Sequence, residues 1–269
     1  MPLLIQNNKN IDLSIIIPVY NEAVPLLGEP RILNSLRRLR QYMAAQAPHM
    51  DYEVLVVDAC SPDGSADLVA DLQQRDRRVR LLQAGPKPAG QFTKGRQVAM
   101  GMLLARGRYA MFMDADLATP LWHLQQVFSL MARNLPIGIG VRDLQRSHHG
   151  VRKLVSVLGN LLVRSVLIGD VPDTQCGFKA FRRDVAQQIF ARQRIHSWGF
   201  DLEVLALAQH YHYDLALINV LDWQDIAEGS KVGERTAFKA ALKVLPDIMW
   251  IKWNLLTGRY DQQSLSAPA

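Results

Sequence analysis

Tyr109-Ala-Met-Phe-Met113 is followed directly by Asp114-Ala115-Asp116, so two carboxylates stand at the end of an apolar run. The run is typical of a buried strand. In open α/β sheets, ligands bind just outside the carboxyl ends of the strands. Two acidic side chains on a bent strand exit can share one divalent cation, and Mg²⁺ is commonly held by one or two carboxylates together with substrate phosphates. An isolated Asp-x-Asp can also be a solvated turn. The other motifs of the chain therefore have to decide between a metal site and a turn.

Composition indicates a globular protein. The 269 residues are 49% hydrophobic and 21% charged, which allows one sizeable core and excludes a disordered chain. The net charge of +6 favours either a solvated basic surface or attraction to phosphates of substrates or of an anionic membrane. No basic run is long enough to indicate nucleic acid as a partner. Cys60 and Cys176 lack metal-ligand spacing and suit a reducing cytoplasm.

No signal peptide or spanning helix is expected. The most apolar stretch, Val151–Ile168, carries several charges that make insertion into a bilayer costly. The stretch Phe238–Leu256 mixes tryptophans with lysines, which suits a helix at a membrane interface as well as one packed on the core. Pro246 is expected to kink or divide that helix. We therefore expect a cytoplasmic protein, soluble or peripheral on the cytoplasmic membrane face.

Strand and helix patterns alternate along the first half, which predicts an α/β fold with a mainly parallel sheet flanked by helices. From Gly150 onward the pattern is more helical, with one further strand at Leu215–Val220. The other expected strands are Leu13–Ile17, Tyr52–Val57, Val79–Leu82, Tyr109–Met113 and Ile137–Val141, and the expected helices lie within Glu29–Ala47, at Lys94–Arg106 and at Leu121–Asn134.

A set of motifs follows in a fixed order along the chain. The motifs are Ile16–Glu22, Val56–Asp58, Lys94-Gly95 and Asp114–Asp116, followed by Asp173–Lys179, Trp198–Glu203 and Glu228–Lys231. The first four resemble the inverting glycosyltransferases of family 2, which have the Rossmann-like GT-A fold. The last three resemble the polyprenyl-phosphate (dolichyl-phosphate) sugar synthases, above all the β-glucosyltransferases and also the mannose synthases. The resemblance extends over Leu13–Tyr260.

This resemblance implies a metal-dependent enzyme that transfers a hexose to a polyprenyl phosphate, with Mg²⁺ or Mn²⁺ as cofactor and UDP-glucose as the first choice of donor. It implies one domain, in which residues 13–117 bind the nucleotide sugar, 118–236 form the acceptor side and 237–260 form a C-terminal helix. Alternatives are GDP-mannose or another donor, a soluble acceptor, and a nucleotide-sugar-binding protein without turnover.

The resemblance also implies a donor site. Asp114 and Asp116 would hold the metal, which neutralises charge on the leaving diphosphate. Glu22 would accept hydrogen bonds from ribose hydroxyls, although a plain turn is the alternative for that segment. Lys94 and Lys231 are further candidates for phosphate contacts, but both could equally be solvated surface residues. The expected nucleotide-sugar contacts are Pro18, Tyr20, Glu22, Val57, Asp58, Lys94, Asp114, Ala115, Asp116 and Lys231.

The acceptor phosphate is expected at Arg142, Arg152 and Ser156, because the resembling synthases use an arginine after this strand and an Arg–Ser pair one helical turn apart. Guanidinium suits this role through its bidentate fork; a basic helix face is the alternative. Asp173 and Asp201 complete the catalytic set, the first without a defined role and the second as an orienting or structural acid.

The chain departs from the family pattern after its second strand. The usual Asp-Asp-Gly-Ser is here Asp58-Ala59-Cys60-Ser61. The missing second carboxylate puts the identity of the base and the affinity for the donor in question.

Overall fold

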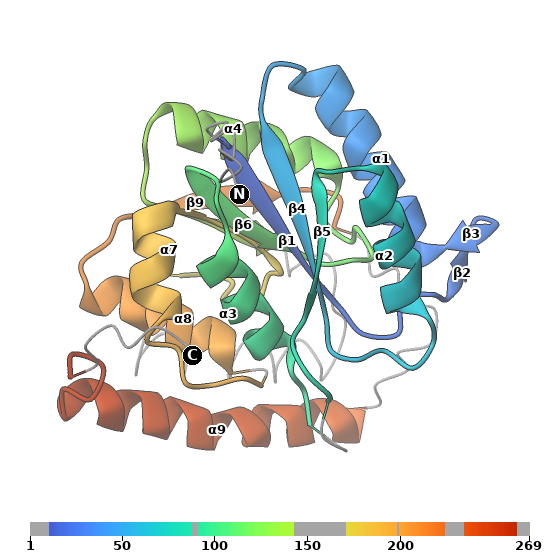
Figure 1. The fold of residues 1–269 in the computed structure, drawn as a ribbon. Helices are drawn as coiled ribbons and strands as arrows, with labels where there is room; N and C mark the ends of the chain where they lie inside the picture. Colours follow the sequence, from blue (N-terminus) through green and yellow to red (C-terminus); the bar gives the residue numbers. More distant parts are fainter. Residues whose placement is uncertain (1–10, 88–90, 143–170, 198, 224–233, 263–269) are drawn as a thin grey trace, which may run out of the picture.

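The computed structural model describes residues 11–87, 91–142, 171–197, 199–223 and 234–262. The strands of its large sheet are β1 (Leu13–Val19), β4 (Tyr52–Asp58), β5 (Val79–Gln83), β6 (Tyr109–Met113), β7 (Ile137–Arg142), β8 (Phe178–Arg182) and β9 (Leu215–Val220). Within the described ranges they form one seven-stranded sheet in the order β5-β4-β1-β6-β8-β7-β9 (Figure 1). β8 runs antiparallel to both β6 and β7, whereas the other pairs are parallel. The predicted mainly parallel sheet is confirmed.

Helices cover both faces of the sheet. Ile15 and Ile17 of β1 belong to the core under α1, α2 and α4, whereas Ile16 points to the opposite core, under α3, α7 and α8. Burial of both faces explains why the strands are continuous apolar runs in the sequence. The helices are α1 (Arg31–Gln46), α2 (Ser65–Arg75), α3 (Lys94–Leu104), α4 (Leu124–Ala132), α7 (Arg183–Phe190), α8 (Phe200–His210) and α9 (Glu234–Leu256).

Two features differ from the sequence-based expectation. β8 was not predicted, because Lys179 interrupts its apolar pattern; the lysine is nevertheless fully buried and donates to Asp201. α9 continues through Pro246 as a single helix instead of being divided there. A small hairpin of β2 (Pro25–Leu26) and β3 (Glu29–Pro30) precedes α1.

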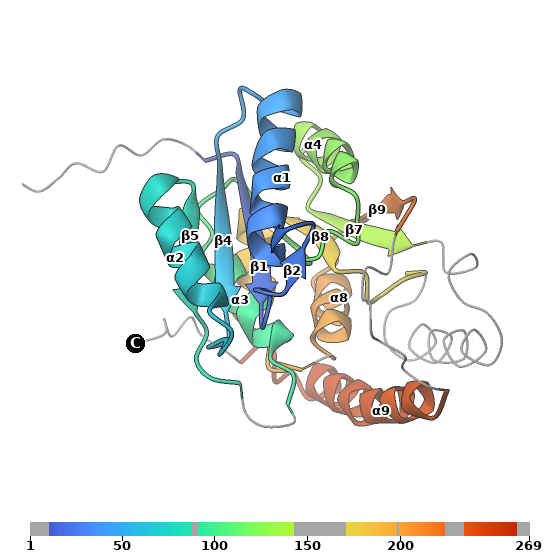
Figure 2. The same ribbon diagram turned by 90° about the vertical axis from the view of Figure 1, so that its right-hand side faces the viewer.

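The carboxyl ends of β1, β4 and β6 lie at one edge of the sheet, and the start of α3 joins them there. Gly95 permits this arrangement, because a Cβ at this position would lie 2.7 Å from Cβ of Phe200 at the start of α8. α9 packs against α8 and lies beneath it in both views (Figures 1 and 2). The fold therefore brings the starts of α3 and α8 together beside the strand exits.

Candidate active site at the carboxyl edge of the sheet

The acidic motif after β6 is held by contacts from two helices and from its own loop. Lys94 Nζ, at the start of α3, donates to Asp114 Oδ1 at 2.5 Å. The carbonyl between the two acids, that of Ala115, accepts from Ser35 Oγ of α1 at 2.5 Å. Asp116 Oδ1 accepts from the backbone N–H of Ala118 at 3.0 Å. These contacts bend the strand exit so that both acidic side chains stay at the sheet edge.

The carboxylates repel one another, and burial strengthens the effect. Burial raises the pKa of Asp116, and the charge of Asp114 raises it further. Glu22, which follows β1, lies within their field: burial raises its pKa to about 7, and Asp116 and Asp114 add to the rise against the opposing charge of Arg31. The Arg31 Nη1 atom contacts Glu22 Oε2 at 3.1 Å. A surplus of negative charge therefore gathers at this edge.

The donor set fits a hard divalent cation. Carboxylate oxygens are the ligands that Mg²⁺ and Mn²⁺ prefer. The ammonium group of Lys94 contacts Oδ1 of Asp114 and would compete with a cation at that atom. Burial alone would lower the pKa of Lys94, but Asp114 and Asp201 raise it, so the lysine stays charged. In the described part of the chain no cluster offers three or more His, Cys, Asp or Glu ligands. Water and substrate oxygens would have to complete the coordination shell.

Asp58 braces the turn after β4. Its carboxylate accepts hydrogen bonds from the backbone N–H of Ser61 at 2.9 Å and from the Ser61 hydroxyl. The same hydroxyl accepts from the backbone N–H of Asn21 at 3.0 Å, which links the exits of β4 and β1. Ala59 is fully buried, so the position of the missing family carboxylate is filled by a small apolar side chain that is out of contact with solvent.

An aromatic cluster stands beside the exit of β1. Lys87 Nζ lies 4.0 Å from the ring centroid of Tyr20 and 5.6 Å from that of Phe92. Sequence reasoning singled out Tyr20 but missed Lys87 and Phe92, because they come from the segment after β5. Pro18 and Val57 face each other in the register of β1 and β4; the Val57 carbonyl accepts from Gln97 Nε2 at 2.7 Å.

The expected acceptor arginine is held by a carboxylate. Arg142 Nε donates to Asp173 Oδ2 at 2.7 Å, Nη2 donates to Oδ1 at 3.0 Å, and the backbone N–H of Arg142 donates to Oδ2 at 3.1 Å. Burial alone would raise the pKa of Asp173, but Arg142 holds it below its ordinary value. The guanidinium also lies 5.0 Å from the ring centroid of Trp223, which sequence reasoning missed. Arg152, Ser156 and Lys231 lie outside the described residues.

Asp201 is buried and paired. Lys179 Nζ donates to Asp201 Oδ1 at 2.6 Å and to the Cys176 carbonyl at 2.7 Å. Burial raises the pKa of Asp201, while Lys179 and Lys94 oppose the rise. A carboxylate that is 3% exposed and bound to a buried lysine is suited to hold structure together rather than to remove a proton from a substrate.

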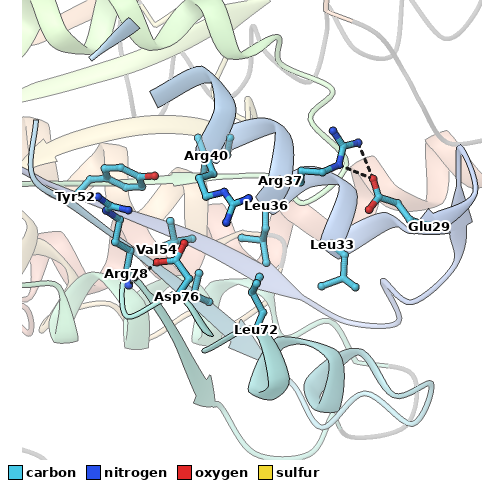
Figure 3. Close-up of a pocket in the computed structure, with 12 residues that line it drawn as sticks. Glu29, Leu33, Leu36, Arg37, Arg40, Tyr52, Val54, Leu72, Asp76 and Arg78 are labelled. Carbon is cyan, nitrogen blue, oxygen red and sulfur yellow. Dashed lines mark hydrogen bonds and ion pairs between the residues drawn. The ribbon is translucent and has the colours of Figure 1, made fainter. Parts of the chain in front are cut away.

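A separate hollow of about 220 Å³ lies between α1, α2 and β4 (Figure 3). Leu36 and Leu72 contribute to its apolar walls, and Arg37, paired with Glu29 at 2.6 Å, stands at its rim. Its lining contains none of the described candidate residues. The candidate chemistry is therefore located at the sheet edge and not in this hollow.

The raised pKa of Glu22 predicts a pH-dependent gain in stability when the carboxyl group is removed. Between about pH 4.5 and pH 7 the folded protein holds a proton that the unfolded chain releases, so this residue lowers stability as the pH rises through that window. Glu22→Gln should therefore be more stable than the wild type at pH 8, by about 1–3 kcal/mol, and nearly equal to it at pH 4.5.

Urea denaturation at the two pH values measures the difference. Glu29→Gln is the matched control, because Glu29 is also paired with an arginine but its pKa is lowered, first of all by its hydrogen bond with Arg37. The control should not gain stability at pH 8. A Glu22→Gln variant that is equally or less stable than the wild type at pH 8 would contradict the prediction.

The sequence matches the family model described as Glycosyl transferase family 2 over residues 14–190. The dolichyl-phosphate beta-glucosyltransferase of Dictyostelium discoideum is 32% identical over 98% of this chain and 81% of its own length. The human dolichyl-phosphate beta-glucosyltransferase is 29% identical over 92% of this chain and 77% of its own length.

Two solved structures share the fold at low sequence identity. Mannosyl-3-phosphoglycerate synthase from Rubrobacter xylanophilus has a TM-score of 0.53 and 14% identity over 96% of this chain and 79% of the other. The mannosyltransferase PcManGT from Pyrobaculum calidifontis, solved in complex with GDP-Man and Mn²⁺, has a TM-score of 0.51 and 14% identity over 96% of this chain and 77% of the other. The fold is thus of the GT-A type, and the match to the family model over more than half of the sequence means that the chain is a glycosyltransferase that belongs to family 2.

Proposed function

We propose that this glycosyltransferase moves a hexose from a nucleotide sugar, in the first place glucose from UDP-glucose, to the phosphate of a polyprenyl lipid of the dolichyl type. The observation that carries the proposal is the gathering at one sheet edge of the Asp114–Asp116 pair with Lys94, and of Arg142 with Asp173. The names of the relatives from Dictyostelium discoideum and human support the acceptor and the sugar.

Each group has a physical task in this reaction. Asp114 and Asp116 would hold Mg²⁺ or Mn²⁺, which supplies Lewis-acid neutralisation of the leaving diphosphate; the Mn²⁺ of the structurally similar mannosyltransferase supports this choice. Lys94 adds a second positive charge beside the diphosphate. Arg142 orients the acceptor phosphate through its guanidinium group.

An acceptor phosphate needs little help from a general base. A phosphate monoester is already ionised near neutral pH, so its oxygen can attack the anomeric carbon directly and invert the configuration there. The buried, lysine-bound Asp201 is consistent with this route, because its carboxylate is 3% exposed and supports β8 instead of facing a substrate.

Removal of Asp116 should abolish most transfer without unfolding the protein. With labelled UDP-glucose, a short polyprenyl phosphate and Mn²⁺, Asp116→Ala should transfer label to the organic phase at least roughly a hundredfold more slowly than the wild type, as expected when a main electrostatic stabiliser is lost. EDTA should stop the wild-type reaction. Asp71→Ala, which removes an exposed carboxylate from α2, is the control and should keep full activity.

The same assay separates the alternatives. Near-normal activity of Asp116→Ala would contradict the metal site. Transfer from GDP-mannose, or to a soluble acceptor alone, would replace the donor or the acceptor named above. Binding of UDP-glucose without any transfer would favour a nucleotide-sugar-binding protein without turnover, with the buried Ala59 as its structural basis.

α9 supports the proposal that the enzyme works at an anionic membrane surface. Met249, Trp253 and Leu256 are 66%, 57% and 77% exposed and follow one another at helical spacing. Ile248 and Ile251 of the same helix are buried against the protein. Tryptophan in an exposed apolar stripe suits a bilayer interface, and the net charge of +6 favours anionic lipids. Among the described residues, no helix is long and apolar enough to cross a membrane.

Charges placed in this stripe should weaken binding to vesicles. The Met249→Asp/Trp253→Asp variant should bind phosphatidylglycerol vesicles at least about tenfold more weakly than the wild type, because both side chains are exposed and would lose apolar contact with lipid. Co-sedimentation measures the change. Leu27→Asp alters a residue that is 86% exposed on the β2–β3 hairpin and should have no effect; equal binding by the α9 variant and the wild type would refute the membrane contact.

A further inference from the structure

A five-residue segment, Asp173–Gly177, touches both halves of the site. Its first residue, Asp173, binds the Arg142 guanidinium and backbone at 2.7, 3.0 and 3.1 Å. Its last residue, Gly177, lies directly against the carboxylate of Asp114, because a Cβ at this position would overlap both of its oxygens. One short stretch of chain therefore contacts the expected acceptor arginine at one end and the expected metal ligand at the other.

The segment is firmly held between these two ends. Asp173, Thr174 and Cys176 are each at most 2% exposed. The Cys176 carbonyl accepts from the buried Lys179 Nζ at 2.7 Å. The backbone N–H of Gln175 donates back to Asp173 Oδ1 at 3.2 Å. Displacement of one end would break buried hydrogen bonds, so the two ends are expected to keep a constant separation.

The pairing of β6 with β8 also keeps the segment beside the acidic motif. Phe178, which follows the segment, pairs with Met113 in the antiparallel β6–β8 ladder. Asp114 follows Met113 directly, so the end of the segment and the start of the acidic motif are neighbours across the sheet. At the other end, the contacts from Asp173 leave the Nη1 atom of Arg142 without a hydrogen-bond partner among the described residues.

We propose that Asp173–Gly177 is a positioning element that sets the distance between the acceptor phosphate at Arg142 and the donor diphosphate at Asp114–Asp116. This inference rests on the proposed function. Asp173 acts through Arg142, and Gly177 acts through Asp114. Their importance follows from the reaction, because attack on the anomeric carbon requires the acceptor oxygen opposite the leaving group, and a misplacement of about 1 Å can cost about a hundredfold in rate.

Two variants separate the ends of the element. Asp173→Asn should raise the KM for polyprenyl phosphate at least about tenfold, lower kcat, and leave the KM for UDP-glucose within about twofold of the wild type. Gly177→Ala should displace the Asp114 carboxylate and weaken Mn²⁺ binding at least about tenfold, measured by titration calorimetry without donor or acceptor. A general loss of structure would instead change the acceptor KM, the donor KM and the Mn²⁺ affinity together.

Asp184→Asn is the matched control. Asp184 forms an ion pair of the same geometry with Arg182, whose Nε and Nη2 atoms lie 2.7 and 2.9 Å from its carboxylate oxygens. This pair is away from the site, so both KM values and the Mn²⁺ affinity should stay unchanged. Thermal unfolding reports whether each variant folds. If Asp173→Asn does not fold, Asp173→Glu, which keeps the charge but moves the carboxylate by one methylene group, should raise the acceptor KM in its place.

The outcomes distinguish this inference from the proposed function. If the wild type transfers sugar but neither Asp173→Asn nor Asp173→Glu changes the acceptor KM more than the donor KM, the positioning element is wrong and the proposed function stands. If the wild type transfers nothing, the proposed function fails; the Mn²⁺ titration then still tests the Gly177 end, and equal affinities of Gly177→Ala and wild type would overturn the inference.

Discussion

The buried ion pair between Lys179 and Asp201 joins the elements on which the candidate site is built. Two charges removed from water are costly unless each is paired and hydrogen-bonded, and removal of one partner leaves the other uncompensated. Here Lys179 of β8 binds both Asp201 of α8 and the Cys176 carbonyl. The pair therefore fixes α8 against the sheet. Because Phe200 at the start of α8 packs on Gly95, it also fixes the start of α3 and the position of Lys94.

Charge balance differs between the whole chain and its sheet edge. The chain carries a net charge of +6, but at the edge the three carboxylates of Glu22, Asp114 and Asp116 are balanced by two cations, Arg31 paired with Glu22 and Lys94 paired with Asp114, which leaves one negative charge in excess. Burial and neighbouring negative charges raise the pKa values of Glu22 and Asp116. A divalent cation would relieve this repulsion and reverse the sign of the local field, so that a nucleotide diphosphate is then attracted.

Sequence reasoning located the strands and the acidic motif, because both faces of the sheet are covered and each strand is a plain apolar run ending in polar residues. It did not find β8, whose buried Lys179 looks like a surface residue until Asp201 is placed beside it. Nor did it find Trp223 or the role of Gly177. Their contacts join residues far apart in the chain. The parallel β7–β9 register brings Trp223 to Arg142, the antiparallel β6–β8 register brings Gly177 to Asp114, and neither leaves a local pattern. The placement of Arg142 at the end of a strand was predicted, but its carboxylate partner was not.

The antiparallel direction of β8 explains how an acceptor-side segment reaches the acidic motif. A strand parallel to β6 would begin at the opposite edge of the sheet, and the residues before it would lie far from Asp114. Because β8 runs the other way, it begins where β6 ends, with Phe178 opposite Met113. The residues before β8 consequently lie beside the residues after β6. One reversed strand in a parallel sheet thus brings Asp173–Gly177 from the second half of the chain into contact with the carboxylates of the first.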